Sequence, residues 1–87
     1  MHEWSIIIPL LRAIESAAEA HHATRVVGAT VAIGPLSGLS EEHLREHFAL
    51  ASRGSIAEGA RLTIDIRRDV DDPGARAIVL ERIEVAE

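Results

Sequence analysis

The chain of 87 residues contains no cysteine, and Trp4 and Phe48 are its only aromatic residues. The absence of cysteine excludes disulfides and any metal site built from thiolates, and it agrees with a reducing compartment. Lysine is absent too: all nine basic residues are arginines, scattered from Arg12 to Arg82, and the formal net charge is −5. Nucleic-acid binding needs a concentrated positive surface, so this charge pattern argues against it.

Long apolar runs are also missing, since none approaches the roughly 20 residues that span a bilayer. Ile6–Ile8 is too short for the core of a signal peptide, has no basic residue before it and runs into Pro9. Even so, 47% of the residues are hydrophobic, which is typical of a folded globular chain. The length allows one small domain. We therefore expect residues 1–87 to form a single soluble domain in the cytoplasm, with no leader before it.

The segment from about Ile6 to Ala23 has the pattern of an amphipathic helix. Proline is tolerated only in the first turn of a helix, so Pro9 predicts that regular helix begins within Ile6–Ile8, with Met1–Ser5 partly extended. The apolar stripe of this helix follows helical spacing and consists of Leu10, Ile14, Ala17, Ala18 and His21.

A second helix is expected to begin after Ser40, whose hydroxyl can cap a free backbone N–H. Glu41 and Glu42 follow, and carboxylates are favoured at the positive end of the helix dipole. Leu44 and Phe48 lie on its apolar stripe, together with Ala51. Gly54 is placed to stop this helix.

The segment Arg25–Gly34 is rich in β-branched residues and is predicted to be the first strand. Strict alternation places Val27 on the face that also carries Ala29, Val31 and Ile33. Both faces are uncharged. Burial on both sides is therefore expected, as in a central strand.

Two more strands are expected in the C-terminal half of the chain. Leu62–Ile66 alternates apolar and polar residues, which predicts one wet face. Residues 69–76 read as a polar turn, and Ala77–Val85 as the last strand, with a bulge near Glu81-Arg82 where the apolar face switches. The predicted order is α–β–α–β–β. It indicates an α+β (two-layer α/β) fold in which a three-stranded mixed sheet packs against two helices.

The first residues, Met1-His2-Glu3, form a candidate metal site. A free α-amine, nearby backbone amides and the imidazole of His2 can all reach one ion. Such a set of nitrogens suits a square-planar divalent metal, in particular nickel(II) or copper(II). An exposed histidine at a frayed terminus is the alternative interpretation.

Several segments, in this order, resemble the hydrogenase and urease nickel-incorporation proteins of the HypA/HybF family. The resemblance covers nearly the whole chain, and the shared order makes it far more specific than the opening tripeptide alone. The segments that carry it are Met1-His2-Glu3-x-Ser5, Ile33-Gly34-x-Leu36-Ser37-Gly38, Leu44-Arg45-x-x-Phe48, Ala57-Glu58-Gly59-Ala60-x-Leu62-x-Ile64 and Ile83-Glu84-Val85.

The resemblance implies a cytoplasmic nickel metallochaperone that binds Ni(II) through Met1, His2 and Glu3. It also implies delivery of the ion to a maturation GTPase or to the precursor subunit of a nickel enzyme such as hydrogenase. Family members carry a zinc domain with two Cys-x-x-Cys pairs between the second and last strands. Here that place holds only the turn 69–76, and without cysteine no structural zinc of the usual sulfur type is expected.

Other polar groups have competing interpretations. His43 and His47 are spaced i, i+4 and could clamp a divalent ion as a second metal pair, although solvated helix histidines are the simpler interpretation. His21-His22 closes the first helix, where imidazolium is favoured by the dipole, and His21 could also be a core histidine. Glu41-Glu42 and Asp71-Asp72 are better explained by helix capping and turn chemistry than by acid–base catalysis.

No pair of nucleophile and base is visible, so the sequence does not predict an enzyme. Two alternatives to a nickel carrier stay open: a protein-interaction or assembly module that keeps the family's fold, and a truncated family domain. The edges of the predicted sheet also make a homodimer conceivable. The client enzyme does not follow from the sequence.

Overall fold

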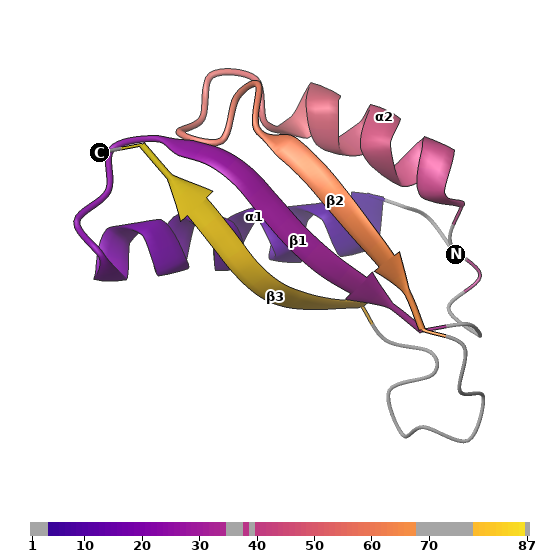
Figure 1. The fold of residues 1–87 in the computed structure, drawn as a ribbon. Coiled ribbons are helices and arrows are strands. Elements are labelled where there is room, and N and C mark those ends of the chain that lie inside the picture. The colour runs from indigo at the N-terminus through magenta and orange to yellow at the C-terminus, as the bar shows by residue number, and fades with distance from the viewer. Residues whose placement is uncertain (1–3, 35–37, 39, 68–77, 87) are drawn as a thin grey trace.

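The computed structural model describes residues 4–34, 38, 40–67 and 78–86. Its elements follow the predicted order α–β–α–β–β (Figure 1). No helix in this described part of the chain is long and apolar enough to cross a membrane. The elements are α1 (Trp4–Ala20), β1 (Val26–Ile33), α2 (Glu41–Ala51), β2 (Arg61–Ile66) and β3 (Ile78–Val85).

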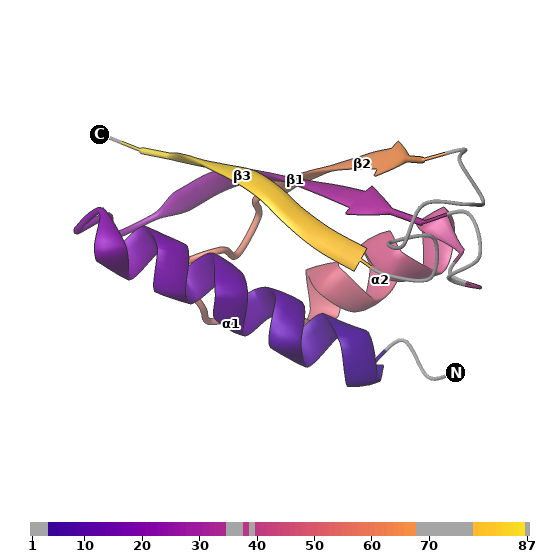
Figure 2. The same cartoon turned by 90° about the horizontal axis from the view of Figure 1, so that it is seen from below.

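The three strands form one mixed sheet in the order β2-β1-β3. β1 pairs with β2 in parallel and with β3 in antiparallel orientation. Figure 2 shows both helices on the same side of the sheet, so the fold has two layers. The predicted fold class is therefore confirmed.

Helix α1 differs from the prediction at both ends. It begins at Trp4, so Trp4 and Ser5 are helical and Pro9 lies inside the helix. Pro9 is exposed, so water can reach the backbone turn before it and the break in the hydrogen-bond ladder is tolerated. The helix ends at Ala20 instead of Ala23, because His22 adopts a positive φ of 55°.

The core lies between the helices and the inner face of the sheet. His21 is exposed, so its interpretation as a core histidine is wrong. Ile7 and Leu11 join the stripe instead, since they lie at helical spacing on the same buried face as Ile14 and Ala18. Helix α2 contributes Leu44 and Phe48, as predicted. The fully or almost fully buried core residues are Ile7, Leu10, Leu11, Ile14, Ala18, Val26, Ala29, Val31, Ile33, Leu44, Phe48, Ala57 and Leu62.

Strand β1 is buried on both faces, as predicted, but helices cover only one of them. Side chains from the flanking strands cover the other: the Arg61 guanidinium lies 3.9 Å from the Glu84 carboxylate, across Gly28. The exception is Val27, which is 44% exposed. A register shift between Val26 and Gly28 turns Val26 into the core and Val27 out of it, so the predicted face of Val27 is wrong.

The predicted bulge in β3 is confirmed. Thr30 of β1 lies opposite Arg82 and Val31 lies opposite Leu80, so Glu81 is the extra residue. As a result Arg82 and Glu84 lie on the outer face of the sheet. The residues of β3 on the inner face are Ile78, Leu80, Ile83 and Val85.

Candidate metal centre

The predicted metal-binding residues Met1, His2 and Glu3 lie outside the described residues, and so does the turn 69–76. Helix α1 begins directly after the tripeptide, at Trp4. The N-terminal end of α1 lies at the same end of the molecule as the first turn of α2 in both ribbon views (Figures 1 and 2).

A hollow of about 280 Å³ lies beside the first turns of α1. It is bordered by Ser5, Ile6 and Pro9 on the helix and by Ile78 and Leu80 on β3. Apart from Ser5 its walls are apolar, so it offers no set of metal-binding side chains. In the described part of the chain, no three or more histidine or carboxylate side chains converge on a point that could hold an ion.

The second predicted metal pair, His43 and His47, lies on α2. Their ring centroids are 6.5 Å apart and the ring planes meet edge to face. His47 Nδ1 lies 2.8 Å from the His43 carbonyl oxygen, so this nitrogen carries the proton and donates to the carbonyl. That hydrogen bond would have to break before His47 Nδ1 could bind an ion.

The pair His21-His22 ends α1, as predicted. His22 N donates to the Glu19 carbonyl at 3.0 Å, and Ala23 N donates to the Ala18 carbonyl at 2.9 Å. These two bonds, with His22 in the left-handed region, are the Schellman motif that ends many helices. His22 therefore has a structural role.

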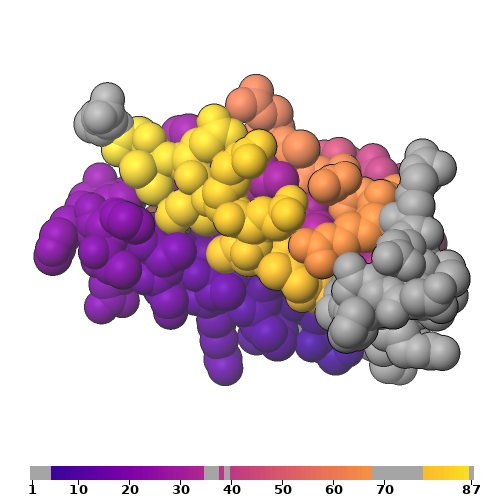
Figure 3. Space-filling model, turned by 60° about the horizontal axis from the view of Figure 1, so that its bottom comes forward, coloured from indigo at the N-terminus to yellow at the C-terminus, as the bar shows by residue number. Residues whose placement is uncertain are grey.

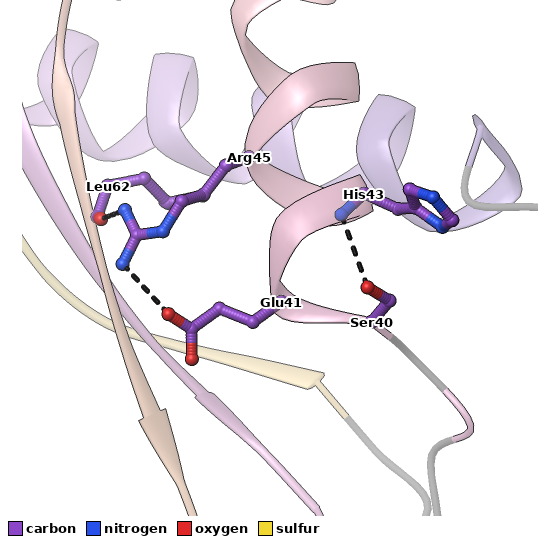
Figure 4. A network of polar contacts seen from close by, with 5 residues as sticks. All are labelled: Ser40, Glu41, His43, Arg45 and Leu62. Atoms are coloured by element: carbon purple, nitrogen blue, oxygen red, sulfur yellow. Dashed lines mark hydrogen bonds and ion pairs between the residues drawn. The ribbon is translucent and has the colours of Figure 1, made fainter.

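The polar groups at the start of α2 also have structural roles (Figure 4). The Ser40 hydroxyl accepts a hydrogen bond from His43 N at 3.4 Å, which confirms the predicted cap. The Glu41 carboxylate lies 3.4 Å from the Arg45 guanidinium. Asp71-Asp72 lies outside the described residues.

Sequence reasoning did not find the contact between α2 and the edge of the sheet. Arg45 donates a hydrogen bond to the backbone carbonyl of Leu62 in β2 (Figure 4). The i, i+4 spacing of Glu41 and Arg45 signals their ion pair. The spacing does not predict the hydrogen bond from Arg45 to the Leu62 carbonyl, because that contact depends on where α2 packs against the sheet.

Comparison with known proteins identifies the class. The family model described as "Hydrogenase/urease nickel incorporation, metallochaperone, hypA" matches residues 1–70. The chain is 44% identical over 64 residues to the hydrogenase maturation factor HypA of Xanthobacter autotrophicus, covering 74% of this chain and 57% of that protein. It is 39% identical over 67 residues to the hydrogenase maturation factor HybF of Salmonella typhimurium, and the match covers 77% of this chain and 59% of that protein.

The chain therefore belongs to the HypA/HybF family of nickel metallochaperones. Members of this family are maturation factors, which agrees with the prediction that the chain is not an enzyme. The matches span somewhat more than half the length of these relatives.

The fold has a close counterpart among solved structures. It matches the solution structure of the Ni metallochaperone HypA from Helicobacter pylori with a TM-score of 0.83, covering 98% of this chain and 97% of that chain. The sequence identity is 17%, so this likeness concerns the fold.

Proposed function

We propose that this chain carries nickel(II) on Met1, His2 and Glu3 and delivers the ion during maturation of a nickel enzyme such as hydrogenase. The observation that carries the proposal is the family match over residues 1–70, which includes this tripeptide. The ligands are the α-amine of Met1, neighbouring backbone amides and the His2 imidazole, a nitrogen set suited to square-planar nickel. Glu3 takes part in the site and in transfer.

The start of α1 favours this chemistry. A backbone amide binds a metal as its anion, and the N-terminus of a helix carries a partial positive charge that stabilises anions. Helix α1 begins at Trp4, directly after the tripeptide in sequence. The helix dipole therefore helps the amides to lose their protons when nickel binds.

The partners in this proposal are a maturation GTPase, the precursor subunit of the nickel enzyme, or both, in the cytoplasm. Residues 1–87 act as a single nickel-binding domain without a zinc domain. β2 ends at Ile66 and β3 begins at Ile78, and the chain has no cysteine.

The proposal is tested by titrating untagged protein with nickel in a calorimeter while following the d–d absorption of planar nickel. His2→Ala removes a ligand, so affinity should fall by more than the roughly 10–100-fold typical of losing an outer-shell partner. An N-terminal tag, which removes the free α-amine, should have the same effect. The double variant His43→Ala, His47→Ala is the matched control and should bind like the wild type.

Binding should also strengthen as the pH rises, because amide ligands must be deprotonated. Undiminished binding by His2→Ala would rule out the proposed site. A wild-type protein that does not bind nickel yet forms a stable complex with a maturation GTPase would support the interaction module instead.

A further inference from the structure

A hollow of about 420 Å³ lies between the C-terminal end of α2 and the start of β2. Its floor is closed by Phe48, Ser52 and Leu62, each at most 5% exposed. Arg45 and Arg53 border it on the α2 side. β2 is an edge strand, and Figure 3 shows it (orange) at the surface, across β1 from β3 (yellow). A hollow of this size beside an open edge can take up a group of another molecule.

Arg53 gives the hollow a guanidinium that is not engaged elsewhere. It follows the C-cap residue Ser52 and is exposed. Its side chain forms no hydrogen bond or ion pair with any other described residue. A guanidinium carries five N–H groups in a fixed fork that matches a carboxylate. Arg53 can therefore bind a carboxylate without giving up an existing contact.

Arg45 and the backbone of Leu62 add further donors. Arg45 donates to the Leu62 carbonyl and lies 3.4 Å from the Glu41 carboxylate, which leaves other N–H groups of its guanidinium for a ligand. Arg67 N donates to the Ile33 carbonyl, and the direction of the backbone groups alternates along a strand. Leu62 therefore turns its N–H away from β1, toward the open edge of β2. Together these groups make the site rich in donors.

Glu58 is the carboxylate that borders the hollow among the described residues. Its Oε1 atom accepts a hydrogen bond from Gly54 N at 3.4 Å, and no ion pair joins it to a described arginine. The described lining therefore carries two positive charges and one negative charge, whereas the chain as a whole has a formal net charge of −5. The hollow is a local positive site on an acidic protein, and it complements a carboxylate.

We propose that the hollow binds a glutamate or aspartate side chain of a protein partner, next to an apolar residue in the partner's sequence. The carboxylate pairs with Arg53, and the apolar neighbour packs on Ala49 and Ala60 at the rim. The hollow lies at the C-terminal end of α2, whereas the first turn of α2 shares an end of the molecule with the start of α1 (Figure 1). It includes no residue of the proposed nickel site, so this interaction goes beyond the proposed function.

A titration followed by NMR tests the site. The ¹⁵N-labelled chain, kept free of metal by a chelator, is titrated with the peptide acetyl-Leu-Glu-Leu-amide. Binding should shift the backbone amide resonances of Gly59 and Leu62 and the side-chain Nε resonance of Arg53. The matched peptide acetyl-Leu-Gln-Leu-amide has nearly the same shape without the charge, and it should bind about fivefold more weakly. Equal binding of the two peptides would overturn the proposal.

Arg53→Gln removes the guanidinium that has no other partner among the described residues. It should weaken binding of the charged peptide about fivefold, the upper end for an exposed ion pair. Arg12→Gln is the matched control, because it removes the same charge from an exposed position on α1 and should bind like the wild type. Arg45 is left unchanged in this series, since it joins α2 to β2.

Glu58→Gln gives a prediction of the opposite sign. It removes the negative charge beside the hollow and keeps a side-chain oxygen that can accept from Gly54 N. The charged peptide should therefore bind more tightly to this variant than to the wild type. A general loss of folding would weaken binding in both variants, so the opposite signs separate an effect on the site from damage to the fold.

Circular dichroism of the variants shows that the fold is retained, since Arg53 and Glu58 are exposed. A wild-type chain that does not bind the charged peptide at millimolar concentration would overturn the proposal. The same holds if Arg53→Gln binds as tightly as the wild type, or if the shifted resonances lie away from the hollow. All these results are independent of nickel binding, because the chelator is present throughout.

Discussion

At the scale of single residues, Gly28 shows how the uncovered face of the sheet is protected. A Cβ atom placed at Gly28 would lie 3.0 Å from Oε1 of Glu84, the residue opposite it in β3. The absence of a side chain lets the Glu84 carboxylate lie over β1 and approach Arg61 at 3.9 Å. A helix layer is therefore not required there.

A double-mutant cycle should reveal this contact. Gly→Ala in a strand interior ordinarily stabilises by about 0.5–1 kcal/mol. In the wild-type background, Gly28→Ala should raise the free energy of unfolding by less than this, because the flexible Glu84 side chain must shift. In a Glu84→Ala background the same substitution should raise the free energy of unfolding by the full amount, as measured by urea denaturation. Equal gains in both backgrounds would show that the contact is unimportant.

At the scale of elements, the end of α1 is set by one residue in an unfavourable conformation. His22 has a φ of 55°, a region that glycine adopts without steric cost. The sequence predicted helix through to Ala23, because a histidine signals the end of a helix much more weakly than a glycine does. The two terminal hydrogen bonds to Glu19 and Ala18 hold His22 in place.

His22→Gly should therefore raise the free energy of unfolding by about 0.5–1 kcal/mol. His21→Gly is the matched control. His22 is the only described residue other than glycine with a positive φ, so glycine at position 21 has no such advantage and should not stabilise. Thermal denaturation of both variants measures the difference, and a gain at both positions would contradict the explanation.

At the scale of the whole molecule, local sequence patterns predicted the helices and strands. The features that the sequence did not predict depend on how these elements pack together. The Ser40 cap, the apolar stripe of α2 and the bulge at Glu81 depend on neighbouring residues and were predicted correctly. The early start of α1 at Trp4 was missed, because an exposed proline is tolerated inside the helix. The contact of Arg45 with β2 also depends on tertiary packing. The tripeptide Met1-His2-Glu3 remains a prediction.

The stability of the domain should not depend on a bound metal. The core is built from all five elements, and the chain has no cysteine that could hold a structural zinc. Treatment with EDTA should therefore leave the melting temperature unchanged within about 1 °C. A shift of about 1 °C is small compared with the roughly 4–8 °C by which a loss of 1 kcal/mol in folding stability lowers the melting temperature of a domain of this size. Unfolding on chelation would reveal a structural metal.

The position of β1 at the centre of the sheet has a consequence for synthesis of the chain. Among the described elements β1 is the first strand in sequence, and both of its neighbours in the sheet, β2 and β3, follow it. Pairing across such sequence separations slows folding. Until β3 leaves the ribosome, the apolar strand Val26–Ile33 keeps an open edge that can aggregate. The nascent chain should therefore be most vulnerable to aggregation just before β3 emerges.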